Sequence, residues 1–167
     1  MPKQYTDAKK KLLEEKVISV SRVTKVTKGG RHFRFSATVV VGNRRGLVGL
    51  GNGKANEVQE AIAKATQAAN KNVVRVSLID NRTIPHEATG KVGRAVVLVK
   101  PAKAGTGVIA GGAARAVLEL AGVKDIVSKS LGSNTQVNVA KATLEALKSV
   151  RTPAKIAALR GLKVEEL

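Results

Sequence analysis

The chain of 167 residues has no cysteine and no tryptophan, and it holds only one tyrosine, two phenylalanines and two histidines. Without cysteine it can form no disulfide, no thiolate metal site and no cysteine nucleophile. Two histidines alone make no convincing metal site, so we expect neither a metal nor a cofactor. With so few aromatic residues, the core must consist of valine, alanine, isoleucine and leucine.

Long apolar segments are also missing: no run approaches the roughly 18 to 20 residues that a membrane-spanning helix needs. The acidic residues Asp7, Glu14 and Glu15 are untypical of a signal or transit peptide. We therefore expect a cytoplasmic protein with no membrane partner. The acids are scattered without a paired set, and Ser, His and Asp do not cluster, so we expect no enzyme and no small-molecule substrate.

Positive charge is in large excess. Thirty Lys and Arg against twelve Asp and Glu give a net charge of +18. Such a charge repels itself in a compact fold, and a polyanionic partner is the simplest remedy. The stretch from Lys16 to Asn56 contains nine basic residues and no acid, whereas an ordinary surface mixes the two signs. This stretch is therefore the first candidate for a nucleic-acid contact.

Periodicity and turn residues predict an α+β protein of two small units, each with strands followed by a helix. The first is an antiparallel sheet with a helix, and the second is a small α/β domain. We expect an N-terminal extension at 1–16, a first domain at 17–80, a second domain at 81–150 and a basic tail at 151–167.

In the first part of the chain, β-branched and alternating residues predict strands, and apolar residues at helical spacing predict a helix. The strand that contains Phe33 and Phe35 should have one buried face. The expected elements are a short helical pattern at 9–16, strands at 17–26, 33–41 and 47–50, a helix at 58–69 and an extended segment at 73–79.

In the second part, Gly90–Gly93 should turn the chain between two strands, and Gly122 should end a helix whose face consists of small residues. A last helix should be capped near Ser133 or Asn134. The expected elements are strands at 83–89, 94–100 and 125–129, and helices at 110–121 and 137–147.

The most specific local motif is the Gly-Gly turn of residues 27–32, in which a cation precedes the two glycines and another follows them. Gly29 and Gly30 lack Cβ atoms, can take positive φ and can bring peptide N–H groups against phosphates. Lys28 and Arg31 would supply the charge. The alternative is a flexible hairpin tip without a ligand. We assign no catalysis to His32, because no carboxylate lies nearby in sequence to orient it.

Two glycine-rich segments imitate nucleotide-binding motifs. Gly42–Lys54 ends in Gly-Lys before a helix, but Val48 and Ala55 stand where a Walker loop needs glycine and a hydroxyl residue. What remains is a helix N-terminus where Lys54 can hold a single backbone phosphate.

The second segment, Gly105–Ala110, fits the dinucleotide pattern G-x-G-x-x-A, with Asp125 twenty residues further on. Pro101–Ala104 separates it from the preceding strand, and the chain around it is too short for a doubly wound sheet. We favour glycines and alanines that permit close packing. A nucleotide- or dinucleotide-dependent enzyme remains the alternative.

Three ordered motifs, at 22–31, 49–55 and 105–112, resemble the bacterial small-subunit ribosomal protein five family, and Gly132-Ser133-Asn134 fits it too. The resemblance covers about residues 10–165. It implies a first unit similar to a double-stranded RNA-binding domain and a structural, non-enzymatic role in the small ribosomal subunit. A free RNA chaperone or a regulatory double-stranded RNA binder outside the ribosome is another alternative.

By this resemblance, the loop matching Thr24 and Lys28–Gly30 reaches small-subunit ribosomal RNA near the junction of head and body. The stretch matching Gly105–Arg115 lies toward ribosomal protein four and influences decoding accuracy, and ribosomal protein eight is another neighbour. The chain departs from the family at Leu50 and Asn52, where aromatics are frequent. It also departs at Arg44-Arg45, where extra phosphate contacts are expected.

The candidate site therefore has two parts, and we expect neither a catalytic nor a metal-binding residue. The RNA-binding candidates are Arg22, Thr24, Lys25, Lys28, Gly29, Gly30, Arg31, Arg44, Arg45 and Lys54, and the protein-interface candidates are Gly105, Gly107 and Arg115.

Overall fold

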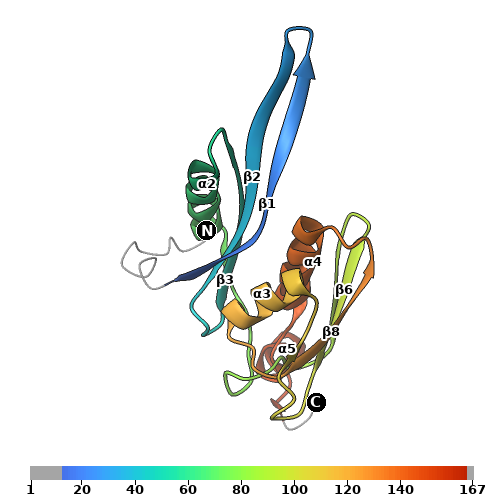
Figure 1. Ribbon diagram of the computed structural model, residues 1–167. Helices are drawn as coiled ribbons and strands as arrows, with labels where there is room; N and C mark the ends of the chain where they lie inside the picture. Colours follow the sequence, from blue (N-terminus) through green and yellow to red (C-terminus); the bar gives the residue numbers. More distant parts are fainter. Residues whose placement is uncertain (1–12, 165–167) are drawn as a thin grey trace.

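The computed structural model describes residues 13–164 as an α+β fold with two four-stranded sheets (Figure 1). The first sheet is antiparallel throughout, in the order β1-β2-β3-β4. One helix, α2, connects β3 to β4 and packs on β2 and β3. The elements of this unit are β1 (Glu14–Thr27), β2 (Gly30–Gly42), β3 (Leu47–Ala55), α2 (Val58–Lys71) and β4 (Val73–Arg75).

The second sheet has the order β5-β6-β8-β7 and is mixed, because β7 and β8 are parallel. Parallel neighbours need a crossover connection, which α3 provides. Helix α4 packs on β5 and β6, and α3 lies between α4 and the strands of the first sheet. The elements are β5 (Ala88–Val92), β6 (Ala95–Pro101), β7 (Val108–Ile109), α3 (Gly112–Ala121), β8 (Ile126–Gly132), α4 (Gln136–Ser149) and α5 (Pro153–Arg160).

Helix α2 lies unusually close to β3, because small residues meet on both sides. Three buried alanines of α2 lie over three glycines of β3, and a Cβ added at any of these glycines would collide with the helix backbone. These glycines therefore permit close packing of helix on strand and do not form a phosphate cradle. The residues are Ala61, Ala65 and Ala69 of α2, and Gly49, Gly51 and Gly53 of β3.

A single large core joins the two units. Val40 and Val48 of the first sheet belong to the same buried cluster as Leu118 of α3 and Leu147 of α4. A smaller cluster lies between α2 and the other face of β2. Residues 37–42 of β2 are therefore buried on both faces, and the expectation of one buried face is wrong for this half of the strand.

Backbone hydrogen bonds also join the units. The N–H of Arg44 donates to the carbonyl of Leu120 over 3.0 Å, and the N–H of Gly46 donates to the carbonyl of Ala121 over 2.8 Å. Gly42 and Gly122 lie at this junction, where a Cβ on either would collide with backbone of the other unit. The C-terminal end of α3 is thus fixed against the β2–β3 turn.

Several sequence-based boundaries need correction. Residues 14–16 belong to β1 and not to a helix, and the rest of the pattern at 9–16 lies outside the described residues. The strand expected at 83–89 begins only at Ala88. Gly90 lies inside this strand and not in a turn. Glycine is required there because a Cβ would collide with the backbone of α4. The turn is made at Gly93, whose φ is +57°.

Two more differences concern the C-terminal half. The N-cap of helix α4 is Thr135, close to the expected position near Ser133 or Asn134, but no side chain makes a cap hydrogen bond there. The segment expected to be only a basic tail contains α5. Its N-cap is Thr152, whose hydroxyl accepts from the N–H of Lys155, and Pro153 opens its first turn.

Candidate nucleic-acid interface

The hairpin of β1 and β2 extends well beyond the rest of the first sheet (Figure 1). Strand β3 pairs with β2 only up to Phe35, which lies opposite Ala55. Beyond that pair the hairpin is a two-stranded ribbon, formed by Val23–Thr27 and Gly30–Arg34. Both faces of such a ribbon are open, and its residues are exposed except for the half-buried Val23. We call residues 22–34 the ribbon.

The ribbon carries five exposed cations, none of which forms an ion pair within residues 13–164. The guanidinium of Arg22 lies over the ring of Phe33, with 4.2 Å between Cζ and the ring centroid. This contact holds one cation in place without neutralising it. The five cations are Arg22, Lys25, Lys28, Arg31 and Arg34.

At the tip, Thr27 pairs with Gly30, so that Lys28 and Gly29 form a two-residue turn. Gly30 has a φ of +129°, which favours glycine, whereas Gly29 does not share this conformation. Within the described residues, the atom nearest to a Cβ added at Gly29 is the hydroxyl of Thr27, 4.0 Å away. Nothing described inside the chain therefore demands glycine at position 29. The missing side chain leaves the backbone of the tip accessible to a partner.

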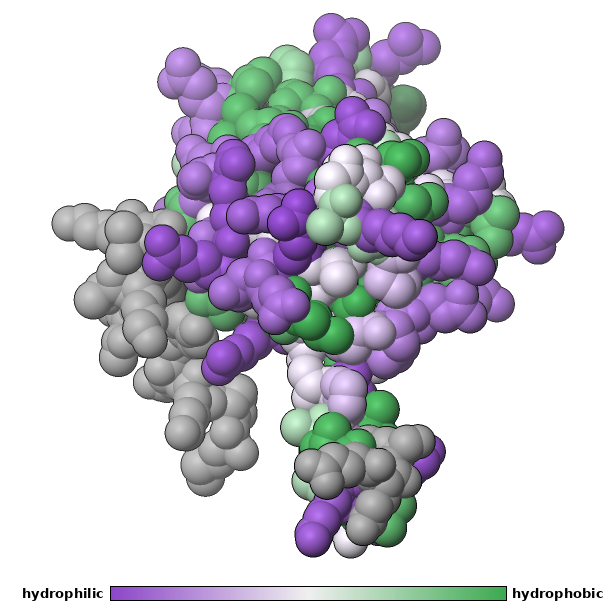
Figure 2. Space-filling view, turned by 90° about the horizontal axis from the view of Figure 1, so that it is seen from below, coloured by the Kyte–Doolittle hydropathy of each residue, from purple (hydrophilic) through white to green (hydrophobic). Residues whose placement is uncertain are grey.

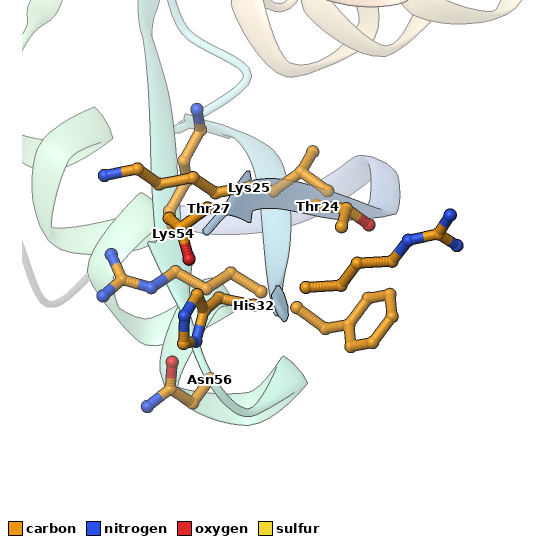
Figure 3. Close-up of a pocket in the computed structure, with 10 residues that line it drawn as sticks. Thr24, Lys25, Thr27, His32, Lys54 and Asn56 are labelled. Carbon is orange, nitrogen blue, oxygen red and sulfur yellow. The ribbon is translucent and has the colours of Figure 1, made fainter. Parts of the chain in front are cut away.

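A groove of about 910 Å³ lies where the ribbon joins the sheet (Figure 3). The strand register places Lys25, Arg34 and Lys54 on one face of the sheet, opposite to the face that α2 covers. Arg31 also lines the groove, and no carboxylate does. We call this feature the cationic groove.

The structure thus brings most of the predicted RNA-binding residues together, but it separates two of them. Arg44 and Arg45 lie in the β2–β3 turn, at the other end of β2. The Nε of Arg44 is 2.8 Å from a carboxylate oxygen of Glu14, so this cation is already paired. The side chain of Arg45 makes no ion pair with a described residue.

The glycine loop of residues 105–107 is bonded internally. The N–H groups of Gly105 and Gly107 donate to one carboxylate oxygen of Asp125, over 2.9 and 3.0 Å. The Nε of Arg82 donates to the other oxygen. Both glycines have positive φ, +93° and +77°. Asp125 and Arg82, which sequence reasoning did not assign to a site, therefore hold this loop in its conformation.

The hydrogen bond from the Gly107 N–H, with the Arg82 side chain next in importance, lowers the pKa of the Asp125 carboxyl. The carboxyl side chain is almost completely buried. An ionised carboxylate therefore occupies the N–H groups that a dinucleotide phosphate would need. The spacing that imitates a cofactor motif serves to fix a loop.

The third interface candidate, Arg115, lies in α3 and is exposed. Its guanidinium approaches the carbonyl of Val108 at 3.4 Å, a long hydrogen bond. Within residues 13–164 no group of acidic or histidine side chains is arranged to hold a metal ion, and no helix is long and apolar enough to cross a membrane.

Family comparison decides which of the sequence-based interpretations holds. A model of the N-terminal domain of ribosomal protein S5 matches residues 13–77, and a model of its C-terminal domain matches residues 90–160. The chain belongs to the ribosomal protein S5 family. Ribosomal protein S5 is a structural, non-enzymatic protein of the small ribosomal subunit in the cytoplasm. The resemblance noted in the sequence is confirmed, and the nucleotide-dependent enzyme is wrong.

Proposed function

We propose that this S5-family protein binds small-subunit ribosomal RNA through the ribbon and the cationic groove, and that it stabilises the arrangement of head and body. This proposal rests chiefly on the ribbon itself, a projecting hairpin with five cations that form no ion pair with any residue of the described range 13–164. Unpaired like charges on a narrow ribbon repel one another, and a phosphodiester chain removes that repulsion. Lys28, Arg31 and Lys54 then act as phosphate contacts, with the backbone at Gly29 and Gly30 close to the RNA.

Phosphate and shape should dominate this contact. Folded RNA exposes its backbone and 2′-hydroxyl groups more readily than the edges of its bases in the deep major groove. The ribbon offers charged and small side chains, the imidazole of His32 and one phenyl ring, that of Phe33, which is engaged with Arg22. It therefore positions RNA and does not read a sequence.

The test is the double charge reversal Lys28→Glu and Arg31→Glu. The double variant should lose affinity for the RNA, and the slope of log K against log salt should become less steep by about 0.7 to 0.9 for each phosphate that the variant no longer neutralises. The matched control is Lys91→Glu and Lys129→Glu, two exposed cations of the second sheet. Quantitative incorporation of the ribbon variant into subunits at normal salt would defeat the proposal.

A second part of the proposal concerns translational accuracy. The loop at Gly105 and Gly107 is held rigidly by Asp125, and it lies beside the exposed Ile109 and Arg115. A rigid loop with an apolar and a charged neighbour suits a protein interface. We propose that it contacts ribosomal protein four, and that ribosomal protein eight is the other neighbour, as the family resemblance implies.

This part is tested with a larger residue at position 107. Gly107→Val should strain the loop, because the φ of +77° disfavours a side chain. We expect altered misreading in a reporter assay and fewer crosslinks from position 115 to ribosomal protein four. Unchanged misreading together with unchanged assembly would reject the assignment, and crosslink mapping of assembled subunits would test ribosomal protein eight separately.

A further inference from the structure

A second cationic pocket, distinct from the groove, lies at the opposite end of β2. It has a volume of about 490 Å³ and lies between the β2–β3 turn, the segment that follows β4 and the start of α5. Three cations line it, Arg45, Arg75 and Lys155, and among the described residues no carboxylate does. We call it the junction pocket.

The three cations come from three separate elements, so the fold and not a local sequence run brings them together. Arg45 lies in the turn, Arg75 in β4 and Lys155 in α5. All three are exposed, and none makes an ion pair within residues 13–164. In contrast, the neighbouring Arg44 is neutralised by Glu14. Three like charges therefore surround one cavity, and no described acidic residue pairs with any of them.

The backbone around the pocket is fixed. The N–H of Val76 donates to the carbonyl of Gly46 over 2.7 Å, which holds the turn against the segment that carries Arg75. The first turn of α5 also faces the pocket, through Thr152 and Lys155. The positive end of the helix dipole adds to the charge of the three side chains. An oxyanion would find cations on several sides of a preformed cavity.

We propose that the junction pocket binds a backbone phosphate of a second RNA segment, separate from the one held by the ribbon. This inference deepens the proposed function and rests on it. The two sites lie at opposite ends of the thirteen-residue strand β2, and at 3.3 Å per residue they are about 40 Å apart. That separation exceeds the Debye length of about 8 Å at physiological salt, so each site attracts RNA independently.

Seen from below, the surface carries many hydrophilic side chains, with hydrophobic ones between them (Figure 2). One chain with two separated phosphate sites holds two RNA segments at a fixed distance. The protein then clamps RNA elements together in addition to binding one of them.

The test uses the full-length chain and short RNA duplexes, with the number of duplexes per chain measured by sedimentation velocity at about 0.15 M salt. The pocket variant is Arg45→Gln, Arg75→Gln and Lys155→Gln. The ribbon variant is Lys28→Glu and Arg31→Glu. The matched control removes three cations from elsewhere and leaves the pocket intact: Lys91→Gln, Lys103→Gln and Lys129→Gln. Thermal unfolding of every variant confirms that it is folded.

We expect two duplexes per chain for the wild type and the control, and one for each of the other two variants. Inorganic phosphate should also shift the amide resonances of Gly46 and Asn81 in the wild type but not in the pocket variant. Two duplexes on the pocket variant, or a single duplex on the wild type that only the ribbon variant loses, would overturn the junction pocket and leave the proposed function standing. If the ribbon variant binds like the wild type and the pocket variant loses a duplex, the ribbon fails and the pocket stands.

Discussion

The tip of the ribbon and the loop at Gly105 have similar compositions, but they differ in whether their backbone donors and cations are bonded within the protein. Both place glycines beside cations on the surface. At the tip the cations form no ion pair with a described residue, and nothing described in the chain requires glycine at position 29. At the loop, two N–H groups and Arg82 are bound by Asp125. Glycine content alone therefore does not distinguish the two segments, whereas the bonding of their backbone donors and charged groups does.

The largest expected effect on stability is that of Asp125→Ala. Removing this carboxylate leaves two backbone N–H groups and Arg82 without their acceptor, in a part-buried position. The melting temperature should fall more than after any of the glycine or histidine substitutions below, and hydrogen exchange at Gly107 should accelerate. As a control, Glu60→Ala removes an exposed acid with one surface pair, and it should change stability by less than about 0.5 kcal/mol. Equal melting temperatures for Asp125→Ala and the wild type would show that the hydrogen bonds of Asp125 do not stabilise the loop.

The same residue predicts a pH dependence. The pKa of Asp125 is lowered in the folded state by the Gly107 N–H and by Arg82, whereas in the unfolded chain it is about 3.9. The stabilisation is therefore complete above the unfolded pKa and is lost as the pH falls through the folded pKa. The wild type should melt above Asp125→Asn at neutral pH, and the difference should shrink below about pH 4. A constant difference from neutral to strongly acidic pH would contradict this assignment.

A smaller contrast is expected between alanine substitutions at the two glycine positions. Gly107→Ala forces a side chain into a φ of +77°, which should cost about 1 to 2 kcal/mol of unfolding free energy. At Gly29 an added Cβ would make only an ordinary contact with the Thr27 hydroxyl, at 4.0 Å among the described atoms, so Gly29→Ala should change stability by less than about 0.5 kcal/mol. It should nevertheless weaken RNA binding, measured by fluorescence anisotropy. If Gly29→Ala lowered stability and left RNA binding unchanged, Gly29 would have a structural role and not a role in RNA binding.

The smallest effect is expected for His32→Ala. His32 lies opposite Lys25 in the ribbon and lines the cationic groove, but its side chain makes no hydrogen bond with a described residue. RNA affinity should change far less than after reversal of Lys28 and Arg31, because His32→Ala introduces no negative charge that would repel phosphates. The same anisotropy titration compares His32→Ala with the charge reversal at Lys28 and Arg31. An equal loss of affinity in the two variants would assign His32 a direct contact with RNA.

Local patterns in the sequence predicted the ribbon and α2 well, because neighbouring residues determine both. Alternation of Phe33, Phe35 and Ala37 specifies a strand, and two glycines after Lys28 specify a tight turn. The alanines of α2 recur at helical spacing and are buried as predicted. The projection of the ribbon beyond β3 did not follow from these patterns, because it depends on where β3 ends.

Features that depend on distant segments were not predictable from the sequence alone. Gly90 looked like a turn residue, and only its contact with α4 shows why a strand contains glycine there. Double burial of Val40 and its neighbours requires the second unit to pack on the first sheet. The junction pocket needs Arg75 and Lys155, which are eighty residues apart. Folding brings such residues together without a recognisable motif.

The backbone bonds between the β2–β3 turn and the end of α3 have a mechanical consequence. Because the carbonyls of Leu120 and Ala121 are bonded to the first unit, and Val40 and Leu118 share one core, no hinge separates the two halves. The hairpin then works as a lever arm on a stiff base. With RNA held at the tip as we propose, a displacement of that RNA would turn the whole molecule, and with it the surface around Arg115.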